Sequence, residues 1–113
     1  MNDPGLTIWK RCLHLSVLLH KITRNLNYPD QFKITANIRR LAIRIPSVLI
    51  YGASLQNPES YQTYLKITVS LLNELEIYLK LLQSATGYQT HKIIQCEVSV
   101  IRSMICDSLI SEN

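Results

Sequence analysis

The sequence predicts an all-α protein, an antiparallel four-helix bundle with up-down-up-down topology. Leu, Ile and Val recur three and four residues apart in long runs, which is the spacing of one face of an α-helix. Only three Gly and four Pro are present, too few for the turns of an all-β chain. The segments between the runs are short and therefore join antiparallel neighbours, so we expect residues 1–113 to form a single domain.

The first helix is expected over about Pro4–Asn27. Asp3 is a favourable N-cap, and Pro4 suits the first helical position, where its missing N–H is not needed. The apolar seam steps by four and three residues through Ile8, Cys12, Leu15, Leu19, Ile22 and Leu26. A second apolar strip, rotated from this seam, consists of Trp9, Leu13 and Val17. This strip either covers a neighbouring helix or meets another subunit.

The second helix is expected over about Gln31–Ala53, after a turn at residues 27–30. Tyr28 precedes a proline and so closes the first helix or follows its end, while Asp30 is placed to cap the second. The seam of the second helix consists of Ile34, Ile38, Leu41, Ile45 and Val48. Pro46 removes one backbone hydrogen bond and clashes with the carbonyl of Ala42. Because the apolar steps continue past it, we expect a kink rather than a break.

The third helix has the clearest start and stop signals. After a loop over residues 52–56, Asn57 is a cap, Pro58 takes the first helical position, and Gly87 ends a helix that runs to about Ala85. Its seam consists of Tyr61, Leu65, Thr68, Leu72, Leu75, Leu79 and Leu82. The tyrosines of this helix could stack nucleic-acid bases, although a half-buried ring with its hydroxyl in water is the commoner arrangement.

The fourth helix is expected to be capped by Thr90 and to run to about Ser111. Its seam consists of Ile94, Val98, Ile101 and Ile105. The three cysteines, Cys12, Cys96 and Cys106, all fall in helical apolar patterns and form no CxxC pair. We therefore expect buried, reduced thiols in a cytoplasmic protein.

Catalysis is not indicated by any spacing in the chain. A glycine-rich phosphate loop, an HExxH motif and a Glu-x-x-His pair are all missing, and His14, His20 and His91 do not converge. We expect no enzyme activity, metal or cofactor. The N-terminus does not have the pattern of a signal peptide, and no uncharged apolar run reaches the ~20 residues that a membrane span requires, so no membrane role is expected.

Positive charge gathers on the second helix. The net charge is +4 and the pI is about 9.1, a modest excess that suits a polyanion but does not require one. Lys33, Arg40 and Arg44 share one stripe with Asn37 and Tyr51, and Arg39 stands at its edge. No acidic residue lies between Lys33 and Tyr51, although neighbouring cations repel.

The stripe therefore favours contact with phosphate groups, the alternative being ion pairs with Glu59, Glu74 or Glu76 on the third helix. Further candidate nucleic-acid-binding cations lie on the first helix, opposite its seam: Lys10, Lys21 and Arg24.

The chain resembles a bacterial four-helix-bundle family. That family includes the 23S rRNA intervening-sequence proteins and the accessory variability determinants of diversity-generating retroelements. Its members show an Arg-Arg pair, then Ser-Ile-Pro-Ser-Asn-Ile-Ala-Glu-Gly, then an aromatic-rich helix with a Leu-x-Glu-Leu-Glu run. The matching residues here are Arg39, Arg40, Ile45, Pro46, Ser47, Gly52, Tyr61, Tyr64, Leu72, Glu74, Leu75 and Glu76. The resemblance extends from about Cys12 to Tyr88.

Departures from the family pattern raise the positive charge of the second helix. Arg44 stands where the pattern has Ser, and Val48-Leu49-Ile50-Tyr51 replaces Asn-Ile-Ala-Glu. This difference favours the retroelement accessory branch over the intervening-sequence branch. The resemblance to that branch implies a homopentamer that binds reverse transcriptase together with template RNA or complementary DNA.

Three hypotheses follow from these observations. The chain is an accessory protein of a retroelement that binds reverse transcriptase and nucleic acid, an RNA-binding protein associated with ribosomal-RNA insertions, or a bundle that contacts only proteins. In the third case its arginines are held in surface ion pairs.

Overall fold

The structure, a computed structural model, describes residues 4–26 and 29–111 and contains four α-helices over those ranges. They are α1 (Pro4–Asn25), α2 (Phe32–Ser54), α3 (Pro58–Thr86) and α4 (Lys92–Ser111), with a short 3₁₀ helix η1 (Pro29–Gln31) before α2. The predicted fold class is confirmed. The predicted cap Asp3 and the turn residues Asn27 and Tyr28 lie outside the described residues.

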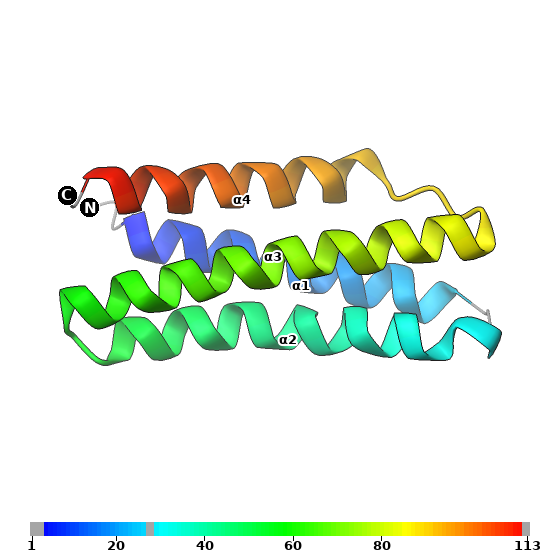
Figure 1. Cartoon of the computed structure of the whole chain (residues 1–113), viewed down its shortest axis with the longest axis horizontal. Helices are drawn as coiled ribbons and strands as arrows, with labels where there is room; N and C mark the ends of the chain where they lie inside the picture. The colour runs from blue at the N-terminus through cyan, green and yellow to red at the C-terminus, as the bar shows by residue number, and fades with distance from the viewer. Residues whose placement is uncertain (1–3, 27–28, 112–113) are drawn as a thin grey trace.

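The helices form an elongated bundle of 44 × 23 × 22 Å in which each runs antiparallel to the one before it (Figure 1). α2 packs against both α1 and α3, and α4 packs against the same two helices from the other side. The α2–α3 loop lies at one end of the bundle, and the other two connections lie at the opposite end (Figure 1). α1 and α3 therefore occupy diagonal corners.

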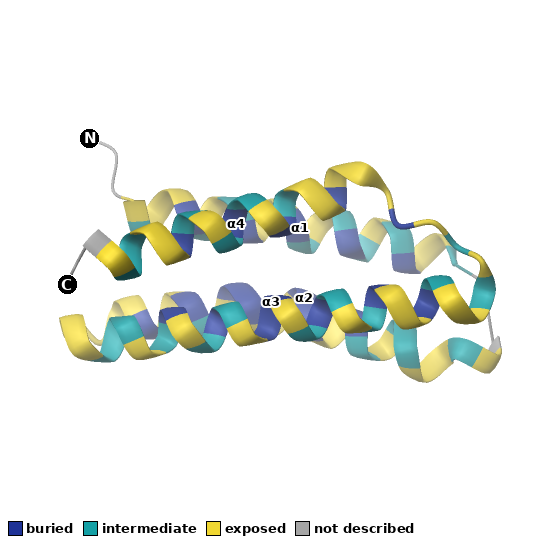
Figure 2. Ribbon diagram, turned by 45° about the horizontal axis from the view of Figure 1, so that its top comes forward, coloured by how far each residue is buried: buried dark blue, intermediate teal, exposed yellow. Residues whose placement is uncertain are grey.

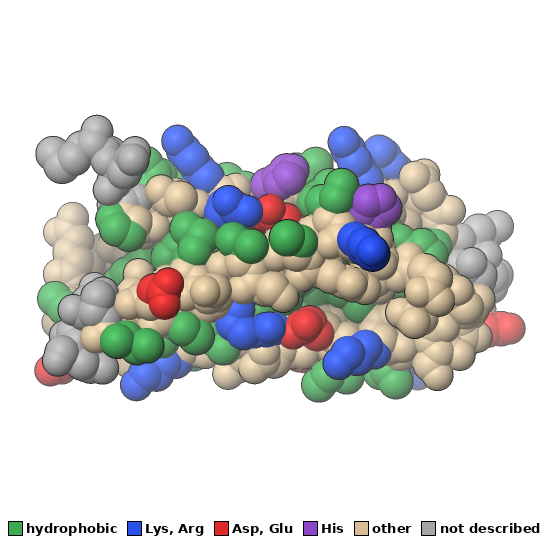
Figure 3. Space-filling model, turned by 90° about the horizontal axis from the view of Figure 1, so that it is seen from above, with side chains coloured by type: hydrophobic (Ala, Val, Ile, Leu, Met, Phe, Trp, Pro, Cys, Tyr) green, Lys and Arg blue, Asp and Glu red, His purple; other side chains and the backbone are tan. Residues whose placement is uncertain are grey.

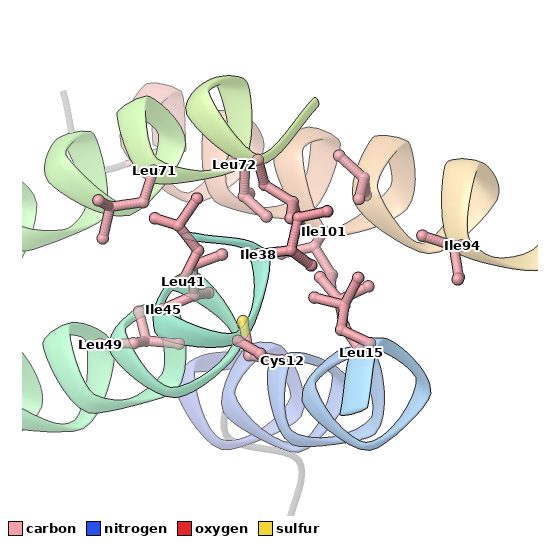
Figure 4. Close-up of a cluster of buried hydrophobic side chains, with 14 of the residues drawn as sticks. Cys12, Leu15, Ile38, Leu41, Ile45, Leu49, Leu71, Leu72, Ile94 and Ile101 are labelled. Carbon is pink, nitrogen blue, oxygen red and sulfur yellow. The ribbon is translucent and has the colours of Figure 1, made fainter. Parts of the chain in front are cut away.

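The core lies between the α1–α4 pair and the α2–α3 pair, and all four helices contribute buried residues to it (Figure 2). Its centre is aliphatic, with Ile38, Leu41 and Ile45 of α2 facing Leu72 of α3 (Figure 4). The predicted seam of α4 is buried along its whole length. Burial of these side chains is the main driving force for the bundle.

The predicted seams of α1, α2 and α3 are only partly buried, and the buried face of each helix is wider than its heptad seam. Ile22, Leu26, Ile34, Val48 and Tyr61 are only half-buried. Their places in the core are taken by residues of the flanks: Thr23, Ala42, Leu49 and Leu71. A helix between two neighbours needs an apolar face broader than a strict heptad seam, which explains the difference. Thr23 and Thr68 satisfy their buried hydroxyls by donating to the carbonyls of Leu19 and Tyr64.

Two of the predicted helix boundaries are confirmed by their hydrogen bonds. The N–H of Ser60 donates to Asn57 Oδ1 over 3.0 Å, and Gly87 ends α3 in the left-handed conformation with φ 77°. Two predicted caps are wrong. Gln31, not Asp30, precedes α2, because a 3₁₀ turn intervenes.

At the start of α4 the predicted cap Thr90 is replaced by His91. The N–H of Ile93 donates to His91 Nδ1 over 3.1 Å, and the Thr90 side chain is buried.

α2 runs through Pro46 without a break, as the sequence predicts. Gly52 lies within the last turns of this helix and is buried. A Cβ at position 52 would lie 2.5 Å from Tyr64 Cβ, so a side chain has no room there. Gly52 therefore permits the close approach of α2 and α3 that places Tyr64 beside the end of α2.

α4 is joined to its neighbours by two ion pairs. Arg11 Nη2 of α1 donates to Glu97 Oε1 over 2.7 Å, and Arg102 donates to Glu76 of α3. Both pairs are half-buried. Among the helices of the described ranges, none is long and apolar enough to cross a membrane.

Candidate nucleic-acid interface

The basic stripe, defined as Lys33, Arg40 and Arg44, runs along the exposed side of α2. The buried side of the helix carries the aliphatic residues, so the cations are turned to solvent on the flank next to α3. Asn37 lies on the same stripe: its amide donates to the carbonyl of Lys33, and its Oδ1 accepts from Arg40 over 3.4 Å. The predicted alignment of these residues is confirmed.

One cation of the stripe is paired. Arg40 Nη2 lies 3.3 Å from Glu74 Oε1 of α3, and both side chains remain substantially exposed. Glu76, the other candidate partner in the centre of α3, pairs with Arg102 of α4 instead. Within residues 4–26 and 29–111, no carboxylate lies within ion-pair distance of Lys33 or Arg44. Ion pairing thus accounts for one of the three positive charges, and an exposed pair of this kind is weak.

Tyrosines border the basic stripe. Tyr51 continues the stripe toward the end of α2 and is 54% exposed. Its ring meets that of Tyr64 edge to face, with centroids 5.2 Å apart and an interplanar angle of 74°. Tyr78, one turn after Glu74 on the same side of α3, is half-buried. The Tyr51–Tyr64 pair was not predicted from the sequence, although the short α2–α3 loop limits which residues of the two helices lie at the same level.

The other predicted cations lie away from the stripe. Arg39 is exposed but is rotated by about 100° from Arg40, toward the α1 side of α2. Lys10, Lys21 and Arg24 are exposed on the outward face of α1, opposite its buried side. The seven predicted residues therefore form one stripe of three on α2 and a separate set on and near α1.

The side of the bundle that α4 presents does not concentrate one sign of charge. Lys, Arg, Asp and Glu side chains are interspersed there, with hydrophobic side chains between them (Figure 3). Such a mixed surface attracts a polyanion less strongly than a run of cations does. Among the described faces, the α2–α3 side with the basic stripe is the better candidate for contact with phosphates.

The second apolar strip of α1 was expected either to cover a neighbouring helix or to meet another subunit, and its residues differ in this respect. Trp9 is half-buried and helps to line a cleft of about 390 Å³ with Leu49, Ile50 and Ala53 of α2, so it covers a neighbouring helix. Leu13 and Val17 remain exposed. These two residues are thus available to another subunit.

The expectation that all three cysteines are buried is wrong for two of them. Cys96 and Cys106 are exposed, because α4 packs with one side only and both residues fall on its outer side. Cys12 is buried in the core. Burial, followed by the nearby charge of Glu97, raises the pKa of Cys12 to about 12. The Cys12 thiol therefore stays protonated near neutral pH and is a poor nucleophile there.

The histidines do not form a site with other ligating groups in the described part of the chain. His20 Nδ1 lies 2.8 Å from the carbonyl oxygen of Ser16, and His91 contacts the backbone at the start of α4. No group of three or more His, Cys, Asp or Glu side chains that could hold a metal is present within the described ranges. The Lys and Arg side chains of the basic stripe can form electrostatic contacts and donate hydrogen bonds.

Comparison with known proteins finds similarity to a family model. No curated protein and no solved structure matches the chain significantly. The family model described as 23S rRNA-intervening sequence protein matches residues 5–105, which includes all of the basic stripe and nearly all of the four helices. The chain belongs to the 23S rRNA-intervening sequence protein family.

Proposed function

We propose that this protein is a non-enzymatic nucleic-acid-binding accessory protein of a diversity-generating retroelement. In this role it binds reverse transcriptase together with template RNA or complementary DNA. The observation that carries the nucleic-acid part is the basic stripe, in which Lys33 and Arg44 have no acidic partner within the described residues. Phosphates supply the compensating charge that α2 and its neighbours do not.

Two positions on the exposed flank of α2, one in the basic stripe and one bordering it, support the retroelement branch over other members of the family. Arg44 replaces the Ser of the family pattern, and Tyr51 replaces its Glu. Both side chains are exposed on the same flank of α2. Relative to the pattern, this flank gains one positive charge and loses one negative charge, which strengthens its attraction for a polyanion.

A second candidate function is binding to ribosomal RNA that carries an intervening sequence. The family description favours it, because the match covers most of the chain. The basic stripe serves this function equally well, since contacts to phosphates position a protein without reading sequence. The two candidates differ in the polymerase partner, which only the first requires.

Self-association is the third part of the proposal. The exposed apolar residues Leu13 and Val17 of α1 lie outside the core. On α2, exposed apolar residues also face away from the core: Phe32, Ile43 and Ile50. Covering these side chains in a homo-oligomer, which the family resemblance suggests is a pentamer, removes apolar surface from water. Measurement of the mass in solution by light scattering tests this part, and a monomer at micromolar concentration would contradict it.

Triple replacement of Lys33, Arg40 and Arg44 by alanine tests nucleic-acid binding. The probes are a labelled single-stranded RNA, a single-stranded DNA of the same sequence, and the corresponding DNA duplex. We expect the triple variant to bind more weakly and to show a shallower salt dependence, with the slope of log affinity against log salt reduced by about 2 for single strands. Helicity and oligomeric mass should not change, because the three side chains are exposed.

A matched control removes the same number of charges elsewhere. Lys66, Lys80 and Lys92 are exposed on α3 and α4, away from the basic stripe, and are replaced together by alanine. This control lowers the net charge equally, so general attraction of the whole protein for nucleic acid changes by the same amount. If both triple variants bind alike, the stripe is not the binding surface. If the unaltered protein shows no salt-dependent binding to any probe, a bundle that contacts only proteins is the better interpretation.

The polymerase partner is tested separately. Co-purification of the protein with a reverse transcriptase encoded beside it, near template and variable repeats, supports the retroelement assignment. If the protein binds RNA in cells and no reverse-transcriptase gene lies beside its own, binding to ribosomal RNA is the better assignment.

A further inference from the structure

Tyr51 is the exposed aromatic side chain that extends the basic stripe. It lies seven residues after Arg44, two helical turns or about 10 Å further along α2. From Lys33 to Tyr51 the row covers about 27 Å of helix surface. An exposed ring at the end of a row of cations is the combination with which proteins hold single strands, in which cations meet phosphates and rings meet bases.

The neighbouring helix holds Tyr51 in place. Its ring meets that of Tyr64 edge to face at 5.2 Å, and Tyr64 itself is half-buried against α2. Because Gly52 lacks a side chain, Tyr64 approaches α2 more closely than any other residue at position 52 would allow. The contact restricts the rotation of Tyr51 before any ligand arrives, which lowers the entropic cost of stacking a base on it.

A duplex does not use this arrangement. Its bases are already stacked on one another inside the helix, so a ring beside the phosphate-binding row gains nothing from them. In a single strand the bases are free to turn away from the backbone. In the described part of the chain, no other aromatic ring lies against Tyr51 except that of Tyr64, so part of its surface is open to a base.

We propose that the α2–α3 face binds single-stranded nucleic acid, with phosphates on Lys33, Arg40 and Arg44 and a base stacked on the ring of Tyr51. This inference rests on the proposed function, since it assumes that the basic stripe meets phosphates. It adds the form of the ligand: an unpaired segment of RNA or complementary DNA rather than a duplex. Base identity is not read, because every base offers a face for stacking.

The test uses the full-length protein and fluorescently labelled probes of about 12 nucleotides, within the range that single-strand-binding domains cover. The probes are single-stranded RNA, single-stranded DNA, a duplex of the same length, and an abasic strand that keeps the phosphates and has no bases. Tyr51→Leu keeps an apolar side chain against Tyr64 and removes the aromatic face. Tyr51→Phe keeps the ring, and helicity of both variants is checked by circular dichroism.

We expect Tyr51→Leu to bind the single strands about 5-fold to 100-fold more weakly, and Tyr51→Phe to bind them as the unaltered protein does. Binding of the abasic strand should be the same in all three proteins. Phe32→Leu is the matched control, because Phe32 is an exposed ring on the same helix but is rotated by about 100° from Lys33. Leucine keeps an apolar side chain at this position for contact between subunits, so Phe32→Leu should leave both the oligomeric mass and single-strand binding unchanged.

The outcomes separate this inference from the function on which it rests. If the triple alanine variant loses binding while Tyr51→Leu binds single strands normally, or if the duplex binds more tightly than the single strands, the stripe binds nucleic acid and the stacking proposal is overturned. If the triple variant binds like the unaltered protein, both proposals fall. A loss with Tyr51→Leu on RNA, on DNA or on both supports the proposal and identifies which strand is its ligand.

Discussion

Replacing Gly52 by alanine should destabilise the protein, although alanine is the better helix former. A Cβ at position 52 would lie 2.5 Å from Tyr64 Cβ and 2.9 Å from Tyr64 Cγ. Both atoms are near the α3 backbone, so the clash is relieved only when the two helices move apart. Overpacking of this kind costs about 1–3 kcal/mol. The upper end of this range applies, because the clashing atoms of Tyr64 adjoin the α3 backbone. Alanine recovers at most about 1 kcal/mol in helix propensity, so the net loss is about 2 kcal/mol.

Urea denaturation followed by circular dichroism measures this loss as a lower midpoint at an unchanged m-value. Ala53→Gly is the matched control, because Ala53 is exposed in the same helical turn. It reports the propensity difference alone and should cost about 0.5–1 kcal/mol. A Gly52→Ala protein that is as stable as the unaltered protein, or more stable, would refute the inference that α2 and α3 need this close approach.

Other predictions concern charge and thiol chemistry. Glu74→Gln should raise nucleic-acid affinity a few-fold at low salt, because it removes the carboxylate that pairs with Arg40. It should cost at most about 1 kcal/mol of stability by denaturant titration. Unchanged affinity would argue against phosphate contact near this pair. Cys96 and Cys106 should react rapidly with a thiol reagent at neutral pH, and Cys12 should react slowly. The time course of labelling measures these rates. Three thiols that react equally fast would contradict the burial of Cys12. Burial, and secondly the charge of Glu97, raises the pKa of Cys12 from 9.0 to about 12. As pH rises, the thiol of the unfolded chain therefore loses its proton before that of the folded protein, and the free energy of unfolding should fall between these two pH values. A free energy of unfolding that stays constant over this range would contradict the prediction.

The fold follows from the sequence because its strongest signals are local. Apolar residues that recur at alternating steps of three and four positions predict the helices. Asn57 and Gly87 define the ends of α3 through hydrogen bonding and backbone conformation that involve only neighbouring residues. The caps predicted for α2 and α4 fail for a related reason. Asp30 and Thr90 are both good capping residues, but the helix starts depend on how the loop crosses the end of the bundle.

The candidate site could be predicted only as far as one helix determines it. The alignment of Lys33 with Arg40 and Arg44 is a property of helical spacing and was visible in the sequence. The Arg40–Glu74 pair and the Tyr51–Tyr64 contact depend on the level at which α3 packs against α2, which periodicity does not give. The exposure of two cysteines was missed because an apolar pattern does not show which side of a helix lacks a neighbour.

The two ion pairs of α4 also select the handedness of the bundle. Apolar seams are nearly symmetric, so they allow the helices to be arranged clockwise or counter-clockwise around the core. On one side of α4, Glu97 pairs with Arg11 of α1, and on the other side Arg102 pairs with Glu76 of α3. Exchanging α1 and α3 around α4 would separate both pairs and leave half-buried charges uncompensated, which is costly. The mirror-image topology is thereby disfavoured by these four charged side chains.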